Sequence, residues 1–173
     1  TEGINEETDR MAHAALLLQR AVAYAEAQNY ADAIADLDDY LSIDTLSAIG
    51  RWERAVCQAM LNSYDASRGQ NVSMKSAQVE GDIAEAIKVA PKNAYLFYNR
   101  GNLYAAAKNY SRAIDDYSRA IEIDPNFAEA YLNRGLARCY SGKTTDGLHD
   151  FSKAGELGLY NAYAISKQLS RKK

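Results

Sequence analysis

The sequence contains few of the residues that build covalent frameworks and metal sites. Only two cysteines, Cys57 and Cys139, occur among 173 residues, so there is no disulfide framework and no paired metal-ligand spacing. The two histidines, His13 and His149, have no partner at a spacing typical of a metal site or of a nucleophile and its base. We therefore predict no catalytic residues, no metal and no cofactor, and hence a protein that is not an enzyme.

Long apolar runs and a strong net charge are also missing. No run approaches the roughly 20 apolar residues that a membrane helix needs, and the N-terminus has no secretory pattern. A net charge of −3 gives no general attraction to a phosphate backbone. These absences predict a soluble chain without membrane insertion and without a nucleic-acid partner. They leave the compartment open between the cytoplasm and the periplasmic or extracytoplasmic space.

What the sequence does contain is an internal repeat. The tetrapeptides YNRG (98–101) and LNRG (132–135) lie 34 residues apart. Upstream, residues 29–44 mirror residues 109–124. A fixed period of this length is typical of stacked helical hairpins. The composition agrees, because prolines are few and strong helix formers such as alanine and leucine are abundant.

The repeated residues resemble those of the tetratricopeptide repeat family. With Ala94 as position 1, the clearest copy has small residues at positions 8, 20 and 27, tyrosine at positions 11 and 24, and proline at position 32. These residues are Gly101, Ala113, Ala120, Tyr104, Tyr117 and Pro125. Small residues let paired helices approach closely, and larger apolar residues fill the space between them. The resemblance implies an all-α, right-handed superhelical solenoid of antiparallel helical hairpins.

The resemblance extends over nearly the whole chain, which we expect to form a single array over residues 1–173. It implies four copies and a C-terminal capping helix, at residues 14–47, 48–93, 94–127, 128–161 and 162–171. The second copy has 12 residues more than the others, and we place this insertion near 62–76, between its two helices. Gly69 and Asn71 predict a turn there, with Ser73 or Ser76 as a helix N-cap. The insertion could belong to a binding face, be tolerated surface length, or contact a further part of a parent protein.

Charged residues also recur at fixed positions. Position 7 is arginine and position 23 is aspartate in all four copies: Arg20, Arg54, Arg100 and Arg134 with Asp36, Asp82, Asp116 and Asp150. The arginines could await an acidic ligand, or each could pair with an aspartate within or between hairpins. We favour a structural ladder of ion pairs, because the aspartates would already occupy the arginines.

In this family the first helix of each hairpin lines a concave face. Mapped onto this sequence by resemblance, a peptide-binding groove would be formed by Trp52, Glu53, Tyr95, Tyr98, Asn99, Asn102, Glu129, Leu132, Asn133, Leu136 and Tyr140. Aromatic rings would supply apolar contact, and the asparagine amides would hydrogen-bond a peptide backbone. Several of these residues, Trp52 among them, could instead pack against neighbouring helices.

The resemblance therefore predicts a protein–protein interaction module that binds a peptide or protein segment on its concave face, as part of a larger protein or assembly. Some members of the family hold chaperone C-terminal carboxylates in a clamp of lysine, asparagine and arginine. Only Asn99 matches that clamp in this sequence, so we disfavour a chaperone tail as the ligand. The alternative function is a structural spacer or a self-association domain.

Overall fold

The computed structural model describes residues 2–67 and 73–170, and the side chains of residues 5–62 and 78–169. The described residues form nine α-helices and no strand, which confirms the all-α class. None of these helices is long and apolar enough to cross a membrane. The helices are α1 (Glu2–Glu26), α2 (Tyr30–Ile43), α3 (Ala48–Ser67), α4 (Ser73–Val89), α5 (Ala94–Ala106), α6 (Tyr110–Ile123), α7 (Ala128–Tyr140), α8 (Thr144–Glu156) and α9 (Asn161–Ser170).

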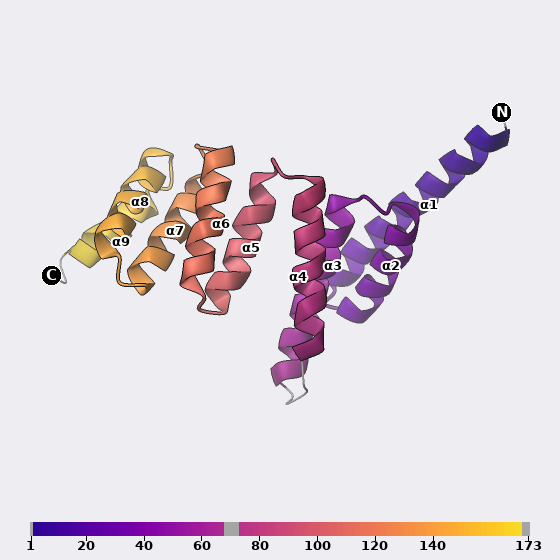
Figure 1. Cartoon of the computed structure of the whole chain (residues 1–173), viewed down its shortest axis with the longest axis horizontal. Coiled ribbons are helices and arrows are strands. Elements are labelled where there is room, and N and C mark those ends of the chain that lie inside the picture. Colours follow the sequence, from indigo (N-terminus) through magenta and orange to yellow (C-terminus); the bar gives the residue numbers. More distant parts are fainter. Residues whose placement is uncertain (1, 68–72, 171–173) are drawn as a thin grey trace. The chain divides into compact units, whose positions relative to one another are not determined.

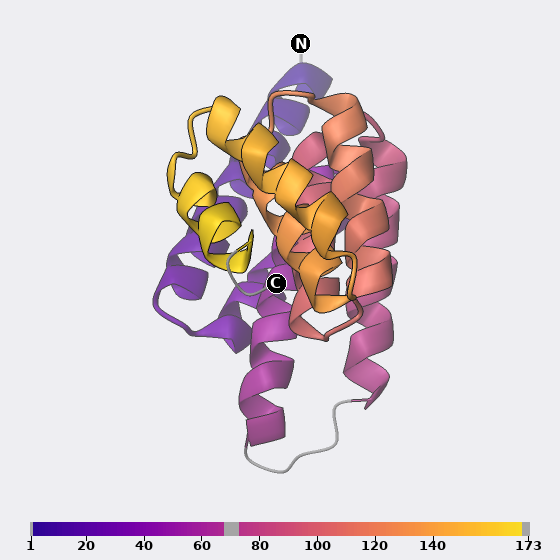
Figure 2. The same ribbon diagram turned by 90° about the vertical axis from the view of Figure 1, so that its left-hand side faces the viewer.

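The chain divides into two compact units, residues 1–91 and 92–173. In the first unit α1 packs against α2, α2 against α3, and α3 against α4. In the second unit α5, α6, α7, α8 and α9 pack in the order of the sequence. The two helices of each hairpin run antiparallel (Figures 1 and 2). Each unit therefore consists of two stacked hairpins, and α9 covers the last hairpin where a capping helix was expected.

The turn between the two helices of a hairpin has the same backbone conformation in three copies. The residue at position 15 is left-handed in each: Gln28 has φ 59°, Lys108 has φ 58° and Gly142 has φ 85°. Only glycine adopts this conformation at little cost. Because glutamine and lysine also adopt it here, the hairpin turn itself imposes the conformation on whichever residue occupies the position.

Each hairpin packs a small residue at position 8 against a larger one at position 24. In the first copy Ala21 clusters with Leu37. In the third copy Gly101 lies against the ring of Tyr117, so that a Cβ at residue 101 would be 2.7 Å from a ring carbon. Gly135 lies equally close to the ring of Phe151 in the fourth copy. The two positions thus compensate in volume. Where position 8 is alanine, position 24 is aliphatic, and where position 8 is glycine, position 24 is an aromatic ring.

Helix α1 is longer than the first copy, 14–47, implies, because it begins at Glu2. Burial begins only at Ala14, and the described side chains before it, residues 5–13, are all exposed. Figure 1 shows this end of α1 projecting beyond α2. Periodicity could not reveal the extension, because a segment without a buried face has no apolar stripe.

The insertion in the second copy lengthens both of its helices. Helix α3 has 20 residues and α4 has 17, against 13 and 14 in α5 and α6. Both extend beyond the lower end of α2 in Figure 1. Helix α4 begins at Ser73, while the turn expected at Gly69 and Asn71 lies outside the described residues.

Candidate functional site

The arginine at position 7 and the aspartate at position 23 form a bidentate pair in every copy. Nε and Nη2 of the arginine donate to the two carboxylate oxygens, at 2.6 and 2.7 Å in the first copy and 3.0 and 2.8 Å in the fourth. Each pair joins the two helices of one hairpin. The pairs are Arg20–Asp36, Arg54–Asp82, Arg100–Asp116 and Arg134–Asp150.

Two of these arginines also reach the preceding hairpin. Nη1 of Arg54 donates to Asp38 on α2 at 2.6 Å, and Nη1 of Arg134 donates to Ser118 Oγ on α6 at 3.1 Å. The hydrogen bonds that Arg54 donates to the Asp82 carboxylate are the main cause that raises the pKa of Arg54 above its ordinary value. These guanidinium groups are held by the scaffold, so they are poorly placed to receive an acidic ligand.

A network of polar side chains joins α5, α6 and α7 in the second unit. Nδ2 of Asn133 donates to Oδ1 of Asn102 at 3.0 Å and to the Tyr98 hydroxyl at 3.1 Å. The Tyr117 hydroxyl donates to the same Asn102 oxygen at 2.8 Å. Within the described residues, Oδ1 of Asn133 and Nδ2 of Asn102 make no hydrogen bond. One amide acceptor and one amide donor are therefore left for a ligand.

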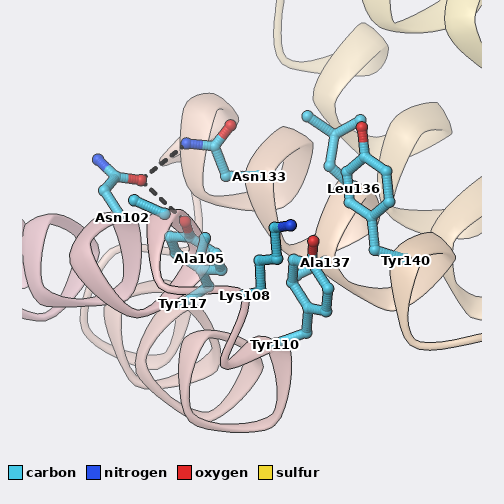
Figure 3. A pocket seen from close by; sticks show the side chains of 10 residues that line it. Asn102, Ala105, Lys108, Tyr110, Tyr117, Asn133, Leu136, Ala137 and Tyr140 are labelled. Carbon is cyan, nitrogen blue, oxygen red and sulfur yellow. Dashed lines mark hydrogen bonds between the residues drawn. The ribbon is translucent and has the colours of Figure 1, made fainter.

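A cavity of about 360 Å³ lies beside this network (Figure 3). Asn102 and Asn133 stand at one end, and the rings of Tyr110 and Tyr140 stack at the other, with centroids 5.3 Å apart. The apolar part of the lining comes from Leu136, Ala137, Ala105 and Ala106, and Tyr117 and Lys108 complete it. The cavity thus brings together four of the mapped groove residues: Asn102, Asn133, Leu136 and Tyr140.

The other mapped residues of the second unit do not line this cavity. Tyr95 and Tyr98 pack their rings against Phe127, at centroid distances of 4.8 and 4.7 Å. Leu132 packs against the buried cluster that contains Phe151. Asn99 is half-buried and Glu129 is exposed. The Tyr98 ring also packs on Tyr117, so this residue contributes to the scaffold as well as to the rim of the network.

Trp52 and Glu53, mapped to the same groove, belong to α3 in the first unit, and both are half-buried. Burial raises the pKa of the Glu53 carboxyl. The neighbouring Cys57 is 1% exposed, and burial, with the Glu53 charge, raises the pKa of its thiol to about 11. A thiol that stays protonated at neutral pH is a poor nucleophile, and Cys57 packs in the buried cluster that contains Ala21 and Leu37.

Six of the ten cavity residues were not among the mapped groove residues. Lys108 and Tyr110 are two of these six. Both come from the turn and the first residue of α6, whereas the mapping considered only the first helix of each hairpin. Tyr110 meets Tyr140 across a separation of 30 residues in the sequence. The recurrence of tyrosine after the turn, at Tyr30 and Tyr110, was the one signal that could have suggested a role beyond the turn.

Residues 94–127, which include six of the ten residues that line this cavity, match the family model of the tetratricopeptide repeat. No curated protein matches the chain in the sequence comparison. Among solved structures, a MamA protein is 24% identical, over 87% of this chain and 81% of that one, with a TM-score of 0.71. PilF of Pseudomonas aeruginosa is 20% identical, over 87% and 63%, with a TM-score of 0.69.

An O-GlcNAc transferase of Thermobaculum terrenum is 17% identical over 85% of this chain, with a TM-score of 0.67, but the match covers only 26% of the transferase. Sequence identities this low are evidence for a shared fold alone. That fold is the one of tetratricopeptide-like solenoids, which generally serve as protein–protein interaction modules. Residues 94–127 are therefore a tetratricopeptide repeat, and the chain has the all-α hairpin fold of tetratricopeptide-repeat proteins.

Proposed function

We propose that the chain is a non-enzymatic module that binds a segment of another polypeptide, and that the cavity between α5, α6 and α7 is its centre. The observation that carries the proposal is the composition of this cavity, in which an amide pair faces two stacked tyrosine rings across an apolar lining. Asparagine side chains can hydrogen-bond a peptide backbone whatever its sequence, and tyrosine rings supply contact area at a low entropic cost. This combination suits an extended peptide.

The test is a selection of peptides from a displayed random library, followed by titration of each selected peptide. We expect the double variant Asn133→Ala/Tyr140→Ala to bind them at least about tenfold more weakly, because hot-spot aromatic residues commonly contribute more than 1 kcal/mol. Tyr160→Ala is the matched control, since Tyr160 is 76% exposed and does not line the cavity. Unchanged affinity of every selected peptide for the double variant would contradict the proposal.

A second candidate, self-association, is favoured by an open face of α1. In the second and fourth copies the first helix is covered by the preceding hairpin: Cys57 and Ala137, at position 10, are 1% and 2% exposed. The equivalent Ala23 of α1 is exposed, and Leu16 on the same face is 62% exposed. Arg20 follows the same pattern, with a side chain 59% exposed against 18% and 14% for Arg54 and Arg134.

We propose a second copy of the chain as the occupant of this face, packed through antiparallel α1 helices. Asp9, Ala12, Leu16 and Ala23 follow one another at spacings of three, four and seven residues, which fit the heptad period that pairs helices. An antiparallel pair centred between Ala14 and Ala15 would set Asp9 of one copy opposite Arg20 of the other. The same surface patch then serves both copies, as a two-fold interface requires.

Light scattering on size-fractionated protein tests self-association. We expect a mass that rises with concentration towards that of a dimer, and a monomer at every concentration for Leu16→Glu, because the substitution buries a carboxylate in the interface. Leu46→Glu is the control, since Leu46 is 72% exposed and lies between α2 and α3. A wild-type chain that remains monomeric, or a Leu16→Glu dimer, would rule this candidate out.

A further inference from the structure

The cavity between α5, α6 and α7 has an unbalanced charge. Ten described residues line it, of which Lys108 is the one charged residue and none is acidic. Within the described part of the chain, the Lys108 ammonium makes no ion pair. In this respect Lys108 differs from Arg100, Arg134, Arg138 and Lys153 of the same unit, each of which has a carboxylate partner.

The position of Lys108 is held by the hairpin turn. Its backbone is left-handed, with φ 58°, and its N–H donates to the Ala105 carbonyl at 2.9 Å. Figure 3 shows its side chain extending between the asparagine pair and the two tyrosine rings. The Tyr110 and Tyr140 hydroxyls make no hydrogen bond to described residues, so two O–H donors accompany the ammonium. A cation and neutral donors on an apolar lining form a site for an anionic group.

We propose that this cavity binds an acidic side chain of an extended peptide, and that Lys108 is the residue that selects it. The inference rests on the proposed function, because it assumes that the ligand is a peptide. The carboxylate meets the Lys108 ammonium and the tyrosine hydroxyls. An apolar neighbour of the acidic residue packs on Leu136, Ala137 and the ring faces, and the amides of Asn102 and Asn133 hydrogen-bond the peptide backbone.

A carboxylate fits this site better than a phosphate group. Phosphate recognition commonly uses several guanidinium groups in a bidentate arrangement. No arginine is among the described residues that line this cavity, and Arg100, Arg134 and Arg138 are engaged by Asp116 and Asp150. A single lysine with two hydroxyl donors matches one negative charge. The ligand class is therefore a peptide with an aspartate or glutamate beside an apolar residue.

The chain itself supplies a conservative neutral variant for the test. Gln28 occupies the same turn position in the first copy, with φ 59°, so Lys108→Gln removes the charge while keeping a residue that this turn accommodates. Lys143→Gln is the matched control. It makes the same change of charge at an exposed lysine of the next hairpin turn, outside the cavity lining.

The probes are three acetylated and amidated heptapeptides that differ only at the centre, where leucine is followed by glutamate, glutamine or lysine. Binding is followed by NMR through the resonances of Asn133, Tyr110 and Tyr140. We expect the wild type and Lys143→Gln to prefer the glutamate peptide over the glutamine peptide about fivefold, as for a partly exposed ion pair. Lys108→Gln should bind the two equally, and Lys108→Glu should prefer the lysine peptide. Added salt should reduce the wild-type preference.

Four results would overturn the inference, and they differ in what they mean for the proposed function. The wild type could bind the glutamate and glutamine peptides equally while the NMR resonances of Asn133 and Tyr140 shift. In that case there is no preference for an acidic side chain, but peptide binding at the cavity stands. If Lys108→Gln still prefers the glutamate peptide over the glutamine peptide, only the role of Lys108 in this preference is wrong, and peptide binding again stands. If none of the three peptides shifts the cavity resonances while library-selected peptides do, the acidic ligand class is wrong. If no peptide of either kind shifts them, the proposed function fails as well.

Discussion

Replacing Asp150 with alanine is expected to lower the free energy of unfolding by about 3–5 kcal/mol, because it leaves two half-buried guanidinium groups without their carboxylate. Asp150 is 0% exposed and accepts hydrogen bonds from both Arg134 and Arg138, at 2.8–3.0 Å. The side chains of these arginines are 14% and 23% exposed, so water cannot fully replace the lost partner. Urea unfolding followed by circular dichroism at 222 nm measures the loss.

The same substitution in other copies should cost less, in an order set by the exposure of the arginine. The Arg100 side chain is 28% exposed, so Asp116→Ala should have an intermediate effect. The Arg20 side chain is 59% exposed and can be solvated without its partner, so Asp36→Ala should have the smallest effect. If Asp36→Ala and Asp150→Ala lowered stability equally, exposure would not be the controlling factor. If neither changed the unfolding midpoint, the ion pairs would not stabilise the hairpins at all.

Replacing Gly101 with alanine is expected to destabilise the chain by about 1–3 kcal/mol, although alanine is the better helix former. The added Cβ would lie 2.7 Å from the Tyr117 ring, and this ring cannot move aside easily. Tyr117 is 1% exposed, and its hydroxyl is held by Asn102 at 2.8 Å. The clash therefore outweighs the gain in helix propensity.

Gly81→Ala is the matched control for this substitution. A Cβ at Gly81, inside α4, would meet nothing within 4 Å, so the change should raise stability by up to about 1 kcal/mol. The opposite signs at two helical glycines separate packing from propensity. Thermal unfolding of both variants gives the comparison, and a stabilised Gly101→Ala would show that the ring yields to the new methyl group.

A double-mutant cycle should identify Tyr117 as the cause. The first copy pairs Ala21 with Leu37, so Tyr117→Leu should relieve the clash that Gly101→Ala creates. Tyr117→Leu alone should be destabilising, because it removes a buried ring and the hydrogen bond to Asn102. The double variant should be more stable than the sum of the single effects predicts, by about 1–2 kcal/mol. Additive effects would argue that the two positions do not compensate.

The sequence by itself was sufficient to predict the helical hairpins. The 34-residue period and the small residues such as Gly101 and Ala113 are local signals that recur at set positions. Helix geometry converts such spacing directly into buried and exposed faces. The family resemblance implied a capping helix at 162–171, and α9 spans Asn161–Ser170. The recurrence of charged residues at fixed positions led to the expectation that Arg134 and its equivalents pair with aspartates.

Only the tertiary structure decided which of the possible partners meet. Arginine and aspartate could have paired within or between hairpins, and the structure pairs them within each hairpin while Arg54 and Arg134 also reach the preceding one. The cavity depends on contacts between residues about 30 positions apart, such as Tyr110 with Tyr140 and Asn102 with Asn133. Periodicity along one helix contains no information on the crossing and separation of two helices. The family resemblance implied a common groove for Asn133 and Tyr140, while Lys108, which lines the same cavity, was identified only once the hairpins were packed.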